Sequence, residues 1–159
     1  MTWANYAIGT YGYFGIAVVA AASTMSVFLP TFPLSLLVFL AAAKLNPIVV
    51  GIAAGVGSAT GEMVSYWIAR GGEHILEKKY KKQIHELEQL FQKYKGWLVI
   101  FFVGAIPIVP FDIMGLFAGG IHYDAKKFYL AALGGKTVRY IVVALAGYFG
   151  IHWVLGYFS

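Results

Sequence analysis

Residues 46–69 read NPIVVGIAAGVGSATGEMVSYWIA, an apolar stretch that holds a single charged side chain, Glu62. A helix of this length crosses the roughly 30 Å of hydrocarbon in a bilayer. Residues 7–29 form a second stretch of spanning length without any charge, and residues 128–158 form a third that contains Lys136 and Arg139. The sequence therefore predicts an all-α membrane protein of several spans.

The composition supports a single membrane domain over residues 1–159. The chain is 60% hydrophobic and 12% charged, whereas a soluble domain is about a quarter charged. The first 29 residues lack the basic start of a cleaved signal peptide, so we expect them to remain as an N-terminal helix. With no Cys and four scattered His residues, no metal site or cofactor is expected. No nucleophile with a companion base is visible, so an enzyme is not expected.

The connection formed by residues 70–96 is strongly basic. It holds seven of the 12 Lys and Arg residues of the chain, which by the positive-inside rule makes it cytoplasmic. Its apolar residues recur at helical spacing: Leu76, Tyr80, Ile84, Leu87, Phe91 and Tyr94. The segment is either an amphipathic helix on anionic headgroups or a solvated helix packed on the protein. Nucleic-acid binding is not expected, because no base-reading module accompanies the charge.

Two short patterns recur in the same order in the two halves of the chain, residues 30–69 and 97–159. Prolines 30 and 33 return as prolines 107 and 110, and Gly61-Glu62-x-x-x-Tyr66 returns as Gly135-Lys136-x-x-x-Tyr140. Paired prolines break a helix, and a broken backbone cannot face lipid. Each pair therefore predicts the tip of a re-entrant hairpin followed by a transmembrane helix; a kinked but continuous span is the alternative.

The cytoplasmic connection then orients the rest of the chain. The first hairpin would enter from outside and the second from inside, so that the two halves form an inverted repeat, as in many secondary transporters. The N-terminus would lie inside and the C-terminus outside. If residues 97–121 instead form one full span, the C-terminus changes side.

Ionisable side chains at membrane depth are the candidate substrate or coupling residues. Asp112 follows the second proline pair and is either a proton-coupling or gating acid or the N-cap of the next helix. Glu62 is expected to pair with Lys136 or Arg139 across the repeat. The surplus positive charge would then attract a phosphate headgroup; alternatively, the pair only neutralises two buried charges.

Further candidates share the faces of these residues. Tyr66 and Arg70 follow Glu62 at helical spacing, and Tyr140 is the repeat mate of Tyr66. Arg70 either contacts lipid or reaches the interface as a cation at a helix C-terminus. Small residues that permit close helix packing are Gly57, Gly61, Gly119 and Gly120. The small size and the glycine-rich helices are compatible with a homodimer.

Three motifs resemble the DedA family, also called the VTT-domain or SNARE-associated Golgi protein family. They are Gly57-x-x-x-Gly61-Glu62-x-x-x-Tyr66-x-x-x-Arg70, Pro107 followed by Ala118-Gly119-Gly120, and the closing Gly147-Tyr148-x-Gly150. The resemblance implies two opposed re-entrant loops and movement of lipids between leaflets. It also implies a link to polyprenyl-phosphate carriers or phospholipid scrambling. Three family positions differ: Ser35 stands where many members have an acid, and Gly104 and Pro110 stand where many have arginines.

The first functional hypothesis is therefore a flippase or scramblase of phosphate-headgroup lipids in a prokaryotic cell membrane. Its lipid headgroup would pass through a polar groove between the two loops. One alternative is a secondary transporter that couples protons to the movement of a small ion or solute. The other is a scaffold or assembly factor that docks through the basic helix.

Overall fold

The computed structural model describes residues 3–25, 32–107 and 111–158, and most of these residues lie in helices. This part forms seven helices and no strand, which confirms the all-α class. The helices are α1 (Trp3–Met25), α2 (Phe32–Ala41), α3 (Pro47–Gly71), α4 (Glu73–Tyr94), α5 (Gly96–Ala105), α6 (Asp112–Gly120) and α7 (Ala125–Phe158).

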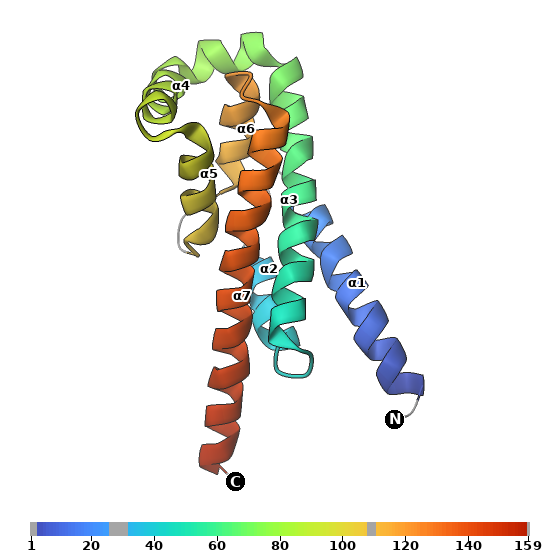
Figure 1. Ribbon diagram of the computed structural model, residues 1–159. Helices are drawn as coiled ribbons and strands as arrows, with labels where there is room; N and C mark the ends of the chain where they lie inside the picture. Colours follow the sequence, from blue (N-terminus) through green and yellow to red (C-terminus); the bar gives the residue numbers. More distant parts are fainter. Residues whose placement is uncertain (1–2, 26–31, 108–110, 159) are drawn as a thin grey trace.

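The helices α3 and α7 pack side by side along the molecule (Figure 1). Within the described ranges, α3 and residues Ala125–Gly150 of α7 are long and apolar enough to cross a membrane. Asn46 fixes the start of α3, because its side chain accepts hydrogen bonds from the backbone N–H groups of Ile48 and Val49, and Pro47 occupies the first turn. The predicted stretches 46–69 and 128–158 thus correspond to α3 and α7.

Residues 97–121 do not form one continuous helix. Helix α5 ends at Ala105 and α6 begins at Asp112, with 10 and 9 residues respectively. Each is about 15 Å long, half the thickness of the hydrocarbon core. Pro107 lies exposed in the intervening turn, and Pro110 falls outside the described residues. The segment therefore contains two short helices rather than one continuous helix, and the re-entrant hairpin stays a prediction.

The first helix reaches only the middle of α3. Thr24, near the end of α1, donates to the Ser58 carbonyl oxygen at 3.0 Å, and α2 then runs back toward the end where α1 begins (Figure 1). Pro33 is the second residue of α2, whereas Pro30 falls outside the described residues. The sequence predicted a first helix that crosses the molecule and an N-terminus on the side of α4. Figure 1 instead marks both chain ends at the end opposite α4.

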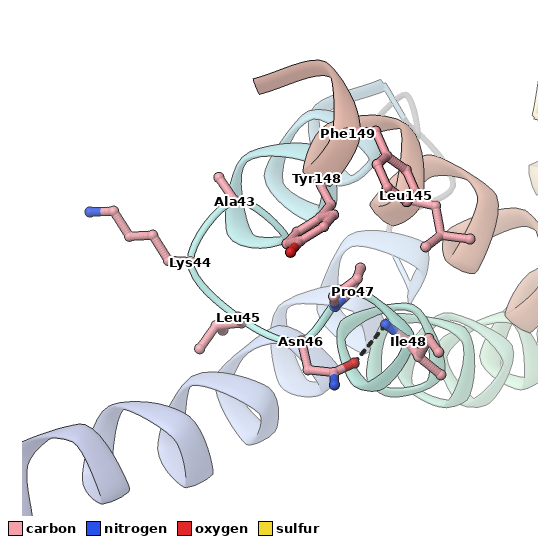
Figure 2. A pocket seen from close by; sticks show the side chains of 9 residues that line it. All are labelled: Ala43, Lys44, Leu45, Asn46, Pro47, Ile48, Leu145, Tyr148 and Phe149. Carbon is pink, nitrogen blue, oxygen red and sulfur yellow. Dashed lines mark hydrogen bonds between the residues drawn. The ribbon is translucent and has the colours of Figure 1, made fainter. Parts of the chain in front are cut away.

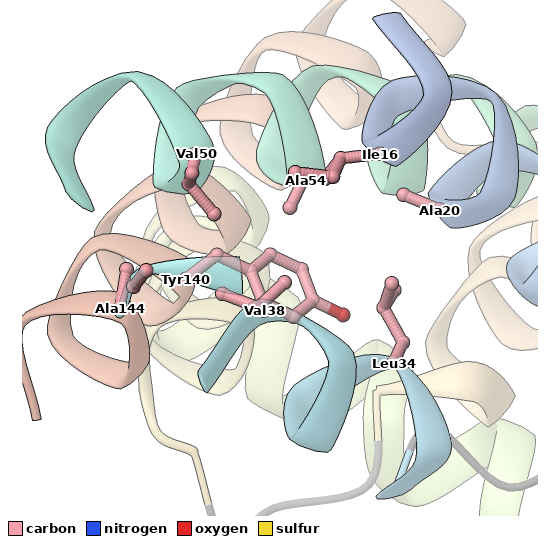
Figure 3. Packing of buried hydrophobic residues seen from close by; sticks show 9 residues of the cluster. Ile16, Ala20, Leu34, Val38, Val50, Ala54, Tyr140 and Ala144 are labelled. Atoms are coloured by element: carbon pink, nitrogen blue, oxygen red, sulfur yellow. The ribbon is translucent and has the colours of Figure 1, made fainter. Parts of the chain in front are cut away.

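Two hydrophobic clusters fill opposite halves of the molecule. We call the first the lower core; it lies between α1, α2, α3 and α7, as Figure 3 shows. It contains Ile16, Ala20, Leu34, Val38, Ala42, Val50, Ala54, Tyr140 and Ala144. The second, the upper core, lies between α3, α4, α5, α6 and α7. It contains Tyr66, Phe91, Ile100, Phe111, Met114, Ala118, Phe128, Ala131 and Ala132.

The predicted basic amphipathic helix is α4, which lies across the upper end of the molecule (Figure 1). Phe91 is buried, and its ring packs edge-to-face on Tyr123 at 5.1 Å between centroids. Lys81, Lys82 and Tyr94 are exposed. Near its C-terminal end, α4 is therefore packed on the turn between α6 and α7, while basic residues remain in solvent.

Candidate functional site

A polar layer separates the lower core from the upper core. We use this name for Ser58, Glu62, Lys136 and Arg139, all of which are buried. Within it, Lys136 Nζ lies 2.8 Å from Glu62 Oε2, and each side chain is 1% exposed. Of the two partners that the repeat offered to Glu62, the structure has Lys136.

The Lys136 ammonium group is surrounded on several sides. Besides Glu62, it donates to Ser58 Oγ at 2.9 Å and to the Ser58 carbonyl oxygen at 3.3 Å. It also lies 4.7 Å from the centre of the buried Phe111 ring, within the range of a cation–π contact. Opposite charge, hydrogen bonds and an aromatic face together offset the cost of burying an ammonium group.

Glycines bring the neighbouring helices close to this pair. A Cβ on Gly115 of α6 would lie 2.7 Å from Glu62 Oε1, and one on Gly61 would lie 2.0 Å from Thr24 Oγ1 of α1. Larger residues at either position would therefore push α6 or α1 away from α3. The small residues of the sequence thus close the polar layer on two sides.

Arg139 binds a different partner. Its Nε donates to the carbonyl oxygen of Ile106 at 3.1 Å, and its Nη2 donates to the same oxygen. Ile106 directly follows α5, where a helix leaves carbonyl groups unpaired. Arg139 therefore ties α7 to the turn between α5 and α6, one helical turn from Lys136.

The charged pair lies about half the thickness of a bilayer core from the basic residues on α3 and α7. Glu62 precedes Arg70 by eight residues and Lys136 follows Lys127 by nine, which corresponds to about 12 and 14 Å along a helix. Half of the hydrocarbon thickness is about 15 Å. If the basic residues mark one interface, Glu62 and Lys136 are near the midplane.

Tyr66 and Arg70 form a separate cluster toward α4. Arg70 Nη1 donates to the Tyr66 hydroxyl at 2.6 Å, and that hydroxyl donates to the Tyr123 carbonyl oxygen. The guanidinium also lies 5.7 Å from the Trp67 ring centre, and the Tyr66 ring stacks on Phe128. These contacts fix the end of α3 against the α6–α7 turn.

The remaining predicted residues are distributed over the molecule. Tyr140 is buried in the lower core beside Val38 (Figure 3). Gly57 and Gly119 are contact points for α1 and α3 respectively, and Gly120 is buried. Asp112 is the first residue of α6; its side chain falls outside the described residues. Its predicted role as a gating acid or a cap thus stays a prediction.

Three residues in or beside the polar layer were not predicted: Thr24, Ser58 and Phe111. Ser58 could have been found, because it stands one turn before Glu62 on the same face of α3. Thr24 lies in an uncharged helix and Phe111 in a proline-rich turn, so neither carries a local signal. Their roles depend on helices that meet only in the folded chain.

The described residues contain no group of three or more His, Cys, Asp or Glu side chains that could hold a metal ion. A family model described as the VTT domain matches residues 29–149. No curated protein matches the chain. No solved structure matches it either.

Proposed function

This chain belongs to the VTT-domain family, whose members are generally non-enzymatic membrane proteins linked to transport or lipid flipping, and we propose that it moves phosphate-headgroup lipids between bilayer leaflets. The headgroup would pass the polar layer between two re-entrant hairpins, α1–α2 and α5–α6. The observation that carries the proposal is the Lys136–Glu62 pair, buried at 2.8 Å near the middle of the two long helices.

The arrangement of α1, α2, α5 and α6 supports two opposed hairpins. Helices α1 and α2 contribute to the lower core, and α5 and α6 to the upper core. Helix α1 ends at residue 25 and α2 begins at residue 32, while α5 ends at residue 105 and α6 begins at residue 112. The ends of α1 and α5 lie beside the polar layer, through the contacts of Thr24 with Ser58 and of Ile106 with Arg139.

Equivalent glycines support the inverted repeat. A Cβ on Gly61 would lie 2.3 Å from the carbonyl oxygen of Ala21 in α1, and one on its repeat mate Gly135 would lie 2.4 Å from that of Phe101 in α5. Each long helix thus uses the same motif position to receive the first arm of one hairpin. Glu62 and Lys136, the next residues in the two motifs, are paired.

The polar layer has the chemistry that a phosphate headgroup requires. Its described side chains include two buried cations, Lys136 and Arg139, with which a phosphate headgroup would interact. In the observed state Phe111 and Gly115 enclose the Lys136–Glu62 pair. Passage therefore needs the α5–α6 turn to move away from α7, which would expose Lys136 and Arg139 to the headgroup.

Reconstitution into liposomes tests this function. We would measure the transbilayer movement of a fluorescent phospholipid and of a polyprenyl-phosphate analogue for wild type, Asp112→Asn and empty liposomes. Movement that requires the protein supports translocation, and a decrease in the variant places Asp112 in the mechanism. No movement of either lipid with folded protein would refute the proposal.

The doubly exchanged variant Glu62→Lys/Lys136→Glu separates two roles of the central pair. Full translocation in the exchanged variant would mean that the pair only neutralises buried charge. Loss of translocation in a folded variant would mean that the cation is needed on α7. Uptake of a small solute that depends on a pH gradient, without lipid movement, would favour the proton-coupled transporter, for which a buried acid–base pair is also suited.

A further inference from the structure

A pocket of about 460 Å³ lies at the end of the molecule opposite α4, between the α2–α3 loop and α7 (Figure 2). Its walls are largely apolar and include Ile48 from α3 and Leu145 and Phe149 from α7. Polar groups come from Lys44, Asn46 and Tyr148. In Figure 2 the Tyr148 hydroxyl points toward the loop and Lys44 extends outward from it. The pocket thus combines apolar walls with the Tyr148 hydroxyl, and Lys44 lies beside it on the loop.

The level of the pocket matches the second surface of a bilayer. Tyr148 follows Lys127 by 21 residues on α7, and Asn46 precedes Arg70 by 24. These separations correspond to about 32 and 36 Å along a helix, slightly more than the hydrocarbon thickness of about 30 Å. If Arg70 and Lys127 mark one interface, the rim of the pocket lies among the headgroups of the other.

The charge at this end of the molecule is unusual. Lys44 is the only charged side chain before Glu62, and no Asp or Glu precedes Glu62 or follows Asp124. Lys44 therefore stands beside the pocket without an acidic residue nearby in the sequence. The positive-inside rule disfavours a cation on the side opposite the basic segment, so membrane orientation does not account for Lys44. Charge complementarity calls for a negatively charged occupant.

We infer that this pocket binds the phosphate headgroup of a lipid at the membrane surface opposite α4. The Lys44 ammonium would contact the phosphate, Tyr148 would donate a hydrogen bond to it, and the apolar walls would receive the first carbons of the acyl chains. This inference rests on the proposed function, to which it adds a headgroup site at one end of the path. A free phosphate ion shares the anionic chemistry but makes no use of the apolar walls.

Photo-crosslinking of the full-length protein in liposomes tests the inference. The probe is a phosphatidic acid with a diazirine close to its headgroup, and the labelled residues are mapped by mass spectrometry. We expect labelling of the segments 43–49 and 145–149. Lys44→Gln should lower this labelling about fivefold, the effect of one basic contact at a membrane surface, and Lys44→Arg should restore it. The control Lys81→Gln, at an exposed lysine of α4, should leave it unchanged.

Three results would overturn the inference. The first is absence of labelling in these segments, and the second is equal labelling in Lys44→Gln and wild type. The latter would leave Lys44 as a cation favoured by the C-terminal end of α2, with an effect on the thermal midpoint alone. The third is competition by millimolar inorganic phosphate, which would identify a site for the free ion.

Translocation measured in the same liposomes keeps the two proposals apart. Lipid movement without labelling at the pocket refutes the headgroup site and leaves the function standing. Labelling without lipid movement refutes the function, and the pocket then remains as a lipid-binding site.

Discussion

Lys136 binds both the side chain and the backbone of Ser58, with Nζ 2.9 Å from Oγ and 3.3 Å from the carbonyl oxygen. Ser58 and Glu62 stand one turn apart on α3. Both accept hydrogen bonds from the Lys136 ammonium group. The same carbonyl oxygen also accepts the Thr24 hydroxyl. Ser58 thereby links α1, α3 and α7 at a single point and fixes their axial positions.

The substitution Ser58→Ala should lower the free energy of unfolding by about 1 kcal/mol, because the buried ammonium loses one of its acceptors. Unfolding of the purified protein by titration with denaturing detergent would measure the loss. Thr60→Ala is the control, since the Thr60 hydroxyl is exposed, bonds to Val56 of its own helix and makes only a long 3.4 Å contact with the Tyr129 hydroxyl of α7. Equal losses in the two variants would contradict the role of Ser58.

The substitution Lys136→Met should cost about 3–5 kcal/mol of stability, because the Glu62 carboxylate would remain buried without its counter-charge. The double variant Glu62→Met/Lys136→Met should recover most of this loss, since no buried charge is left at the pair. Thermal unfolding followed by circular dichroism would compare the two. If both variants are equally unstable, the Lys136 side chain contributes mainly through packing.

The double variant Glu62→Met/Lys136→Met also separates the effect of the ion pair on stability from its effect on activity. The double variant should be folded but inactive in lipid translocation, because the proposed cation is missing from the path. Full activity of this variant would show that lipid movement does not depend on Lys136.

Gly57→Ala should destabilise the contact between α1 and α3. A Cβ at position 57 would lie 2.0 Å from the carbonyl oxygen of Ala17, so α1 must shift, at a cost of about 1–3 kcal/mol. Gly15→Ala is the control, since a Cβ at that helical position meets nothing within 4 Å. The control should gain up to about 1 kcal/mol in helix propensity. Thermal midpoints that move in the same direction would contradict this packing.

Phe91→Ala should release α4 from the turn between α6 and α7, because its ring is the buried contact with Tyr123. Truncation of a buried Phe lowers the free energy of global unfolding by about 3–5 kcal/mol. Here we expect the destabilisation to be confined to α4. Hydrogen exchange over residues 81–94 should become faster, while exchange in α3 and α7 stays unchanged. Tyr94→Ala, at an exposed ring on the same helix, serves as the control.

The sequence predicts those parts of the fold that depend on local hydrophobicity and on charge. The predicted stretches 46–69 and 70–96 match α3 and α4 to within a few residues at each end. The sequence predicted that Glu62 pairs with Lys136 or Arg139, because Glu62 and Lys136 stand at the same place in a repeated motif. In each case the sequence pattern lies within one helix or in the comparison of two repeated motifs.

The sequence does not predict how far along the molecule each helix reaches. Residues 7–29 are long enough to cross a bilayer, but Gly57 and Gly61 hold α1 beside the lower half of α3, so that it ends at the middle. The choice between Lys136 and Arg139 as the partner of Glu62 was also open, since both lie on the same helix one turn apart. In the folded chain Lys136 donates to Glu62, whereas Arg139 donates to the Ile106 carbonyl oxygen in the turn after α5.

The division into two cores has a consequence for cooperativity. The lower and upper cores have no residue in common and are joined by α3, α7 and the polar layer. Opening of one half would therefore leave the apolar contacts of the other intact, as expected for two subglobal unfolding units rather than one. The ion pair between them then acts as the coupling element, and its strength decides whether the molecule unfolds in one step or in two.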